Sequence, residues 1–93
     1  AGLTRAMAVE MGSSIRVNAI EPGAISTPML EAGFSENPEL RRQLEAYHPT
    51  ATIGFPSDVS QAVLFLLDPA NCFLNGCVLT LDGGIRSRLH DPA

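Results

Sequence analysis

The chain has 93 residues, the length of one small domain or of a part of a larger one. Its apolar fraction of 45% is that of a folded globular protein, and the sequence shows neither an apolar run of membrane-span length nor a signal-peptide pattern. Its net charge of −4 argues against a surface for nucleic acid or anionic membranes, since either would need a basic patch.

The first 23 residues predict one helix followed by one strand. Apolar residues recur at helical spacing from Leu3 to Met11, and Gly12 marks the end of this helix. Because no capping residue precedes the pattern, we expect the helix to begin upstream of Ala1. Residues 15–20 (IRVNAI) alternate between apolar and polar and then become apolar, which predicts a strand that Pro22-Gly23 should end.

Four prolines divide residues 25–56, and they favour short helices over one long helix. We predict such helices over residues 29–32 and 38–47. A long, broken connection inside a compact domain is usually a lid or a binding loop, so residues 28–56 are a candidate substrate loop. The helix predicted over residues 38–47 carries two pairs of opposite charge at helical spacing: Glu39 with Arg42, and Arg41 with Glu45.

After Pro56 the sequence predicts another helix, whose pattern is as clear as that of the first helix of the chain. Ser57 or Asp58 can cap its start, with Gln61 as a capping partner. An apolar stripe at helical spacing follows, and Asp68-Pro69 ends the helix. The stripe consists of Val59, Ala62, Val63, Leu66 and Leu67.

A second strand is predicted over residues 77–81 (CVLTL), between turns at Asn75-Gly76 and at Asp82-Gly83-Gly84. The order helix, strand, broken loop, helix, strand predicts a parallel α/β unit. Both strands are apolar at most positions, as expected where helices cover both faces of a sheet. Because two strands cannot form a stable sheet alone, the unit should be the end of a larger sheet.

The cysteines and histidines give no sign of a disulfide scaffold or a metal site. Cys72 and Cys77 are too few for a disulfide framework, and we interpret them as two ordinary thiols beside a turn. A metal site would need more ligands, and His48 and His90 show no helpful spacing. We therefore predict no metal site and expect a cytoplasmic protein.

The stretch VNAIEPGAISTPM, residues 17–29, has the strongest functional pattern in the chain. Ligands of an open parallel sheet bind beyond the carboxyl ends of its strands, where this stretch should lie. Pro22 cannot continue a hydrogen-bond ladder, and Gly23 lets the backbone turn and a flat ring approach it closely. The strand therefore ends where such a ring could bind.

The residues after this turn can hold a ring or a phosphate. Ile25 can offer an apolar face and its backbone amide groups, and Ser26 and Thr27 add hydroxyls that can bond to an amide or phosphate oxygen. The alternative is a plain strand-to-loop turn, in which Thr27 caps a helix that begins at Pro28.

Four stretches of the chain together match one family's pattern. Residues 2–10 (GLTRAMAVE) and 15–29 (IRVNAIEPGAISTPM) match GLTRALAxE…IRVNAIAPGxIxTPM. Residues 52–68 (TIGFPSDVSQAVLFLLD) and 73–84 (FLNGCVLTLDGG) match RIGxPEEVA…VLFLAS…FITGQxLxVDGG. In these motifs, the chain closely resembles the C-terminal part of classical short-chain dehydrogenase/reductases. The resemblance implies an α/β fold in which residues 1–93 form the C-terminal portion of a doubly wound parallel (Rossmann-type) sheet.

The resemblance also implies roles for individual residues. Pro22 and Gly23 match the family's Pro-Gly turn beside the nicotinamide. Ile25 matches the residue whose backbone holds the carboxamide, and Thr27 matches the hydroxyl that contacts the cofactor. Asn18 matches an asparagine on the strand, which we interpret as structural, bonding backbone groups of a neighbouring segment.

As the resemblance implies, the parent protein would be an NAD(P)-dependent oxidoreductase acting on an alcohol or carbonyl substrate. The chain would supply its nicotinamide-side turn, its substrate loop and an oligomer interface. The family's catalytic Tyr-x-x-x-Lys pair is missing, because the chain has no lysine and its one tyrosine, Tyr47, precedes Ala51 by four residues. We therefore expect no catalytic residue in this chain, and by family spacing the pair would lie just before Ala1. The sequence does not decide between NAD and NADP.

An oligomer surface is the last expectation. Leu64 and Phe65 lie off the apolar stripe of their helix, and a second apolar face needs a second partner. By family order the strand 77–81 would lie at the edge of the sheet. The second apolar face of the helix and this edge strand should therefore both be buried in a homodimer or homotetramer. Two alternatives stay open: Leu64 and Phe65 could pack under the proline-rich loop, or the chain could be a non-catalytic binding or assembly module that retains only this surface.

Overall fold

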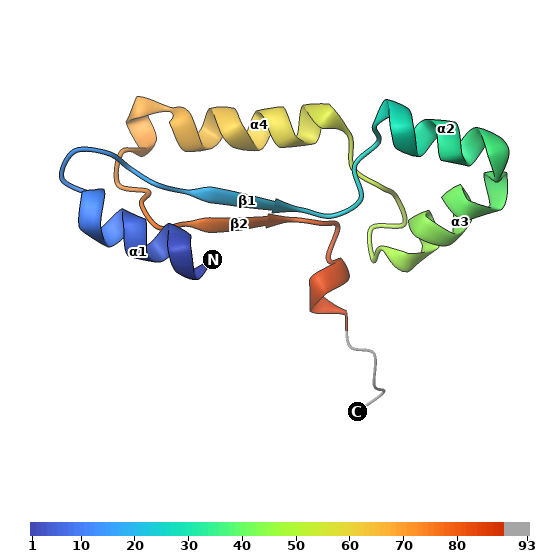
Figure 1. Cartoon of the computed structure of the whole chain (residues 1–93), viewed down its shortest axis with the longest axis horizontal. Helices are drawn as coiled ribbons and strands as arrows, with labels where there is room; N and C mark the ends of the chain where they lie inside the picture. The colour runs from blue at the N-terminus through green and yellow to red at the C-terminus, as the bar shows by residue number, and fades with distance from the viewer. Residues whose placement is uncertain (89–93) are drawn as a thin grey trace. The chain divides into compact units, whose positions relative to one another are not determined.

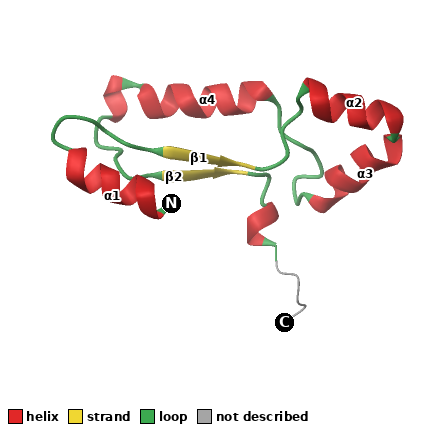
Figure 2. Cartoon of the chain, in the orientation of Figure 1, coloured by secondary structure: helices red, strands yellow, loops and turns green. Residues whose placement is uncertain are grey.

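The computed structural model describes residues 1–88 and contains a parallel pair of strands with helices before, between and after them. This arrangement confirms the predicted α/β class. The elements in chain order are α1 (Gly2–Met11), β1 (Ala19–Pro22), α2 (Pro28–Glu36), α3 (Pro38–Tyr47), α4 (Pro56–Leu67), the 3₁₀ helix η1 (Pro69–Asn71), β2 (Val78–Leu81) and the 3₁₀ helix η2 (Ile85–Ser87) (Figures 1 and 2).

The chain divides into two compact units. The first joins residues 1–21 to residues 57–80, and its buried apolar side chains are Ala8 of α1 with Ala62 and Leu66 of α4. In this unit α1 and α4 lie on opposite sides of the strands (Figure 1). The second unit joins residues 22–56 to residues 81–88 and buries Phe34, His48, Ile53 and Asp82.

Strand β1 begins later than the sequence predicts. The pattern placed the strand at residues 15–20, whereas the structure has it at Ala19–Pro22. Ahead of both strands, asparagine side chains replace part of the backbone pairing: Asn75 Oδ1 accepts from the Val17 N–H before β1 at 3.0 Å, and Asn18 Oδ1 accepts from the Cys77 N–H before β2 at 2.9 Å. Since Asn18 also donates to the Leu74 carbonyl at 3.3 Å, its predicted structural role is confirmed.

The proline-rich segment forms a pair of short helices. Helix α3 has the predicted bounds, but α2 continues to Glu36 instead of ending near residue 32. Gly33 weakens a helix only modestly, and Phe34 beyond it is 5% exposed, so burial of this ring favours the longer helix. Both predicted charge pairs are present: Arg42 with Glu39 at 3.4 Å, and Arg41 with Glu45 at 3.6 Å.

Helix α4 has the predicted end but a different start. The helix begins at Pro56, so Ser57 and Asp58 lie in its first turn. The prediction that one of them caps the helix was therefore wrong. Proline is favoured at the first helical position because it has no N–H to leave unpaired, and Asp58 places a negative charge near the positive end of the helix. The helix ends at Leu67, and Asp68 instead caps η1 through the Ala70 N–H at 2.9 Å.

Strand β2 starts one residue later than predicted and lies between the two predicted turns. Gly76 before it has φ +75°, and Gly83 and Gly84 after it have φ +63° and +90°, values that favour glycine. Asp82 fixes the second turn, since its carboxylate accepts hydrogen bonds from the backbone N–H groups of Gly84 at 2.9 Å and Arg86 at 3.0 Å.

Cys72 and Cys77 are both free thiols. Within residues 1–88, no helix combines the length and apolar character needed to cross a bilayer. His90, which the sequence analysis considered as a metal ligand, lies outside the described residues.

Candidate functional site

The predicted turn lies where β1 ends. Pro22 is the last residue of the strand, as expected, and its carbonyl accepts a hydrogen bond from the Arg86 guanidinium at 3.3 Å. The Gly23 N–H donates to the Leu81 carbonyl at 3.0 Å, so the backbone pairing extends one residue past the strand. Pro22, Gly23, Ile25 and Thr27 all belong to the second compact unit.

Gly23 is closely packed, and this explains why a glycine stands here. A Cβ atom at this position would lie 2.9 Å from Asp82 Cβ and 3.0 Å from Asp82 Cα. Real Cβ contacts essentially never fall below 3.0 Å, so no other residue fits without a shift. Gly23 is not among the glycines with positive φ, so close packing is the observed requirement and backbone freedom is not.

Ile25 leaves its own backbone groups unused. It forms a parallel bridge with Gly54, in which the Ser26 N–H donates to the Gly54 carbonyl and the Gly54 N–H donates to the Ala24 carbonyl, both at 2.9 Å. In such a bridge the N–H and C=O of the middle residue point to the opposite side. Within residues 1–88 neither group of Ile25 has a hydrogen-bond partner, so one donor and one acceptor are available side by side.

Thr27 caps helix α2. Its hydroxyl oxygen accepts a hydrogen bond from the Leu30 N–H at 3.2 Å, and Pro28 follows at the start of the helix. This is the geometry of the alternative that the sequence left open. It does not exclude a ligand contact, because the hydroxyl can still donate its own hydrogen to an acceptor.

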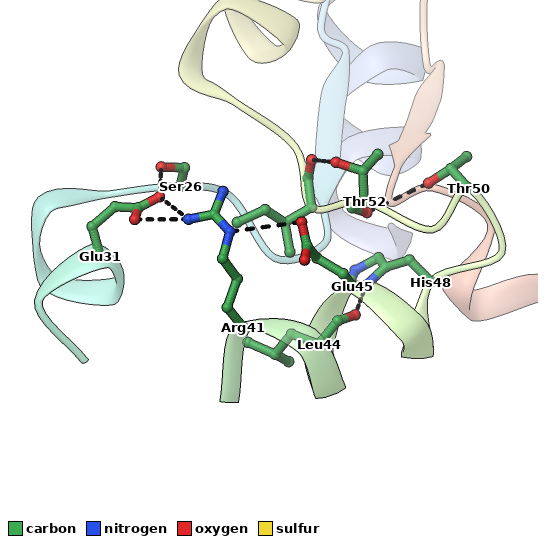
Figure 3. A network of polar contacts seen from close by, with 9 residues as sticks. Ser26, Glu31, Arg41, Leu44, Glu45, His48, Thr50 and Thr52 are labelled. Atoms are coloured by element: carbon green, nitrogen blue, oxygen red, sulfur yellow. Dashed lines mark hydrogen bonds and ion pairs between the residues drawn. The ribbon is translucent and has the colours of Figure 1, made fainter. Parts of the chain in front are cut away.

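A network of charged side chains that the sequence analysis missed adjoins the turn (Figure 3). The Ser26 hydroxyl donates to Glu31 Oε1 at 2.7 Å, and Arg41 Nη1 lies 3.0 and 2.9 Å from the two oxygens of Glu31. The predicted partner of Arg41 was Glu45, one helical turn away. Glu31 belongs to the preceding helix, and the two residues meet because α2 and α3 pack against each other, so helical spacing could not indicate this pair.

Two carboxyl groups of this unit have pKa values below the ordinary one. The Ser26 hydrogen bond lowers the pKa of Glu31, with partial burial opposing it and the Arg41 guanidinium adding to it. At Asp82, burial alone would raise the pKa, but the N–H groups of Arg86 and Gly84 outweigh burial and hold the pKa low. Both carboxylates are therefore charged at neutral pH.

His48 and Tyr47 have structural contacts at the end of α3. His48 is buried, and its Nδ1 lies 2.6 Å from the Leu44 carbonyl, so this nitrogen carries the hydrogen. Its Nε2 has no partner in the part of the chain that the structure describes. The Arg88 guanidinium lies 5.3 Å from the centre of the Tyr47 ring and donates to the Tyr47 carbonyl at 2.7 Å.

Comparison with known proteins decides the family. A family model described as enoyl-(acyl carrier protein) reductase matches residues 1–86. The 2,5-dichloro-2,5-cyclohexadiene-1,4-diol dehydrogenase of Sphingobium indicum is 40% identical over 84 residues, which are 89% of this chain and 34% of that protein. The chain belongs to the short-chain dehydrogenase/reductase family. Another relative in this family, the 7alpha-hydroxysteroid dehydrogenase of Escherichia coli, is 40% identical over 83 residues, or 88% of this chain and 32% of that one.

Solved structures of short-chain dehydrogenase/reductases share the fold. ElxO with NADP bound is 34% identical with a TM-score of 0.86, and the match covers 94% of this chain and 36% of that one. Ligand-free aldohexose dehydrogenase of Thermoplasma acidophilum is 28% identical with a TM-score of 0.85, and the match covers 99% of this chain and 39% of that one. The expected Rossmann-type fold is thereby confirmed. The chain spans about one third of the length of the curated relatives that it matches.

Proposed function

We propose that this chain supplies the nicotinamide-side turn and the substrate loop of an NAD(P)-dependent oxidoreductase that acts on an alcohol or carbonyl. One observation carries the proposal: the backbone N–H and C=O of Ile25 are unpaired beside a closely packed Gly23. A carboxamide has one acceptor oxygen and a donor NH₂, so these two groups fit it in number and kind. The NADP-bound relative ElxO supports the choice of a nicotinamide cofactor.

Each residue of the turn has a defined task in this proposal. Pro22 ends the strand, and Gly23 allows the turn to pack against Asp82, where a side chain would clash. Ile25 would hold the carboxamide, and Thr27 would donate its free hydroxyl hydrogen to the cofactor while it caps α2. A bound nicotinamide supplies or accepts the hydride, and these residues only bind and orient it.

We place the proton-transfer chemistry outside this chain. The chain has no lysine, and Tyr47 is held at the end of α3 under Arg88. In the family the pKa of the catalytic tyrosine is lowered by a lysine ammonium, which nothing in this sequence can supply. We propose that the chain is the C-terminal part of its parent protein, because its motifs resemble that part of the family.

The 93-residue chain should accordingly transfer no hydride with either NAD(H) or NADP(H). The expected result is a rate equal to buffer in an absorbance assay across a panel of alcohols and carbonyls. Turnover by a pure preparation that disappears on mutation of Tyr47 to phenylalanine would contradict this placement of the catalytic residues.

Substitutions of Thr27 test the cofactor turn in a protein that contains this chain together with the Tyr-x-x-x-Lys segment. Thr27→Ala should weaken cofactor binding by about 1 kcal/mol, the usual contribution of one hydrogen bond. Thr27→Ser, which keeps the hydroxyl, should bind as the unmodified protein does, and calorimetric titration measures all the affinities.

A third variant separates cofactor contact from helix capping. Thr27→Asp keeps an N-cap oxygen for the Leu30 N–H but has no hydrogen to donate. It should retain the helix content and lose affinity. If Thr27→Ala and Thr27→Asp both bind cofactor normally, Thr27 is a helix cap alone.

Exposed apolar side chains favour a second candidate function, a surface for self-association. Leu64 and Phe65 of α4 are 68% and 55% exposed. We propose that they meet a second copy of the chain in a homo-oligomer, together with β2, which pairs only with β1 in residues 1–88. A protein that self-associates but binds neither nicotinamide cofactor would be the assembly module without the enzyme function.

A further inference from the structure

We propose that Glu31 and Arg41 are positioning residues that hold Ser26, and through it the backbone of Ile25 and Thr27, in the geometry of the cofactor turn. This inference rests on the proposed function for its purpose. Its first test measures local backbone order and needs neither cofactor nor activity.

The three side chains form a continuous polar connection from the turn to both helices of the hairpin. Ser26 donates to Glu31 on α2 at 2.7 Å, and Glu31 accepts from Arg41 on α3 at 2.9 and 3.0 Å. Figure 3 shows Arg41 extending from α3 to the oxygens of Glu31, with Ser26 beside the same carboxylate, where both residues bond to Oε1.

Ser26 is the residue through which this connection would act on the turn. It lies between Ile25 and Thr27, so its two backbone dihedral angles set the direction of the peptide groups on either side. Its N–H is fixed by the Gly54 carbonyl at 2.9 Å, and its side chain is fixed by Glu31. Because the N–H and the side chain of Ser26 are both held, the Ile25 carbonyl, which shares a peptide group with that N–H, has little freedom to rotate.

Arg41 is itself held in place by two further groups. Its guanidinium lies 5.2 Å from the centre of the Phe34 ring, which is buried, and 3.6 Å from Glu45. An arginine whose guanidinium lies between two carboxylates and an aromatic face has less rotamer freedom than an arginine that pairs with one surface carboxylate. The side chains of Arg41 and Glu31 remain 35% and 42% exposed, so water and salt weaken the pair. A coupling of up to about fivefold is the magnitude expected for a pair of this kind.

Hydrogen exchange without cofactor, in a protein that contains this chain together with the Tyr-x-x-x-Lys segment, is the first test. Arg41→Met should speed exchange by about two- to fivefold at the Ser26 amide, which donates to Gly54, and at the Leu30 amide, which donates to Thr27. Arg42→Met is the matched control, because Arg42 lies on the same helix and pairs with Glu39 but is 79% exposed. The control should change either rate by less than about twofold. Equal effects of the two substitutions would overturn the proposal.

A double-mutant cycle tests whether Ser26 and Arg41 act through Glu31. If they do, Ser26→Ala combined with Arg41→Met should speed Leu30 exchange no more than the stronger single substitution does. Multiplication of the two single effects would mean independent roles and would contradict the proposal. Should a variant fail to fold, salt serves on the unmodified protein. Raising it from about 0.05 to about 0.5 M should speed Ser26 and Leu30 exchange relative to the Gly54 amide, and equal changes at all three would refute the role.

Cofactor affinity then links the connection to the proposed function. In a protein that contains this chain and a Tyr-x-x-x-Lys segment, Arg41→Met should weaken cofactor binding by about two- to fivefold, while Arg42→Met leaves it unchanged. Normal affinity in Arg41→Met would refute positioning of the cofactor site. If the unmodified protein binds no nicotinamide cofactor, the proposed function fails, whereas the exchange results still decide whether Glu31 and Arg41 order the turn.

Discussion

Replacement of Arg16 with methionine should lower the free energy of unfolding by about 2–4 kcal/mol. Arg16 precedes β1, and its Nη1 lies within hydrogen-bond distance of three carbonyl oxygens: Leu66 at 3.1 Å, Asn71 at 3.2 Å and Leu74 at 3.0 Å. Leu66 lies in the last turn of α4, where carbonyl groups have no partner within the helix and the helix dipole attracts a positive charge. Methionine keeps the apolar stem but removes a charged donor from all three carbonyls. The Asn71 and Leu74 carbonyls keep a second donor, in the Leu74 N–H and the Asn18 side chain, whereas the Leu66 carbonyl is left without one.

The effect of Arg16→Met is measured by urea unfolding, followed by circular dichroism, of a protein that contains this chain together with the Tyr-x-x-x-Lys segment. Arg5→Met on α1 is the control, since Arg5 is exposed and its replacement should change stability by less than about 0.5 kcal/mol. Arg16→Lys should fall between the two, because an ammonium can reach fewer of the carbonyls than a guanidinium can. A loss of less than about 1 kcal/mol in Arg16→Met would show that water replaces the guanidinium at these carbonyls.

The parts of the fold that the sequence predicted are those with strong local rules. Proline fixes φ and has no N–H, which is why the start of α3 at Pro38 was predictable. Glycine tolerates positive φ, which is why the turn at Gly76 and the pair Gly83-Gly84 were predictable too. Even the ion pair between Arg41 and Glu45 follows from helical spacing alone.

The misplaced boundaries have tertiary causes. Residues 15–18 have a strand-like pattern, but the Val17 N–H bonds to the Asn75 side chain, while the Val17 carbonyl accepts from the Gly76 N–H in the turn before β2. Burial of Phe34 extends α2 past Gly33, where local propensity predicts an end. Contacts at large sequence separation decide both cases, and a single sequence does not reveal them.

The candidate site divides in the same way. The Pro-Gly turn and the hydroxyl of Thr27 were visible as residue types in a known order. The unpaired backbone groups of Ile25 were not, since they depend on the bridge to Gly54, which lies 29 positions further on. The contact between Glu31 and Arg41 depends on the angle between two helices, which no spacing in the sequence encodes.

Gly23→Ala should destabilise the protein by about 1–3 kcal/mol, the usual effect of adding a methyl group to a closely packed site. The added Cβ would lie 2.9 Å from Asp82 Cβ and 3.0 Å from Asp82 Cα, which is main chain and cannot rotate away. Asp82 is 8% exposed and is held by the N–H groups of Gly84 and Arg86, so moving it would also disturb the turn after β2.

Gly33→Ala is the matched control for Gly23→Ala, because it adds the same methyl group to the same compact unit. A Cβ at Gly33 would meet no atom within 4 Å, and Gly33 lies inside helix α2, where alanine is favoured over glycine by up to about 1 kcal/mol. The free energy of unfolding, measured with urea, should therefore fall in Gly23→Ala and rise in Gly33→Ala. The backbone of the turn would also shift in Gly23→Ala, so cofactor binding should weaken in that variant and not in Gly33→Ala. If Gly23→Ala proves as stable as the unmodified chain, Asp82 can yield, and close packing is not the reason for a glycine at this position.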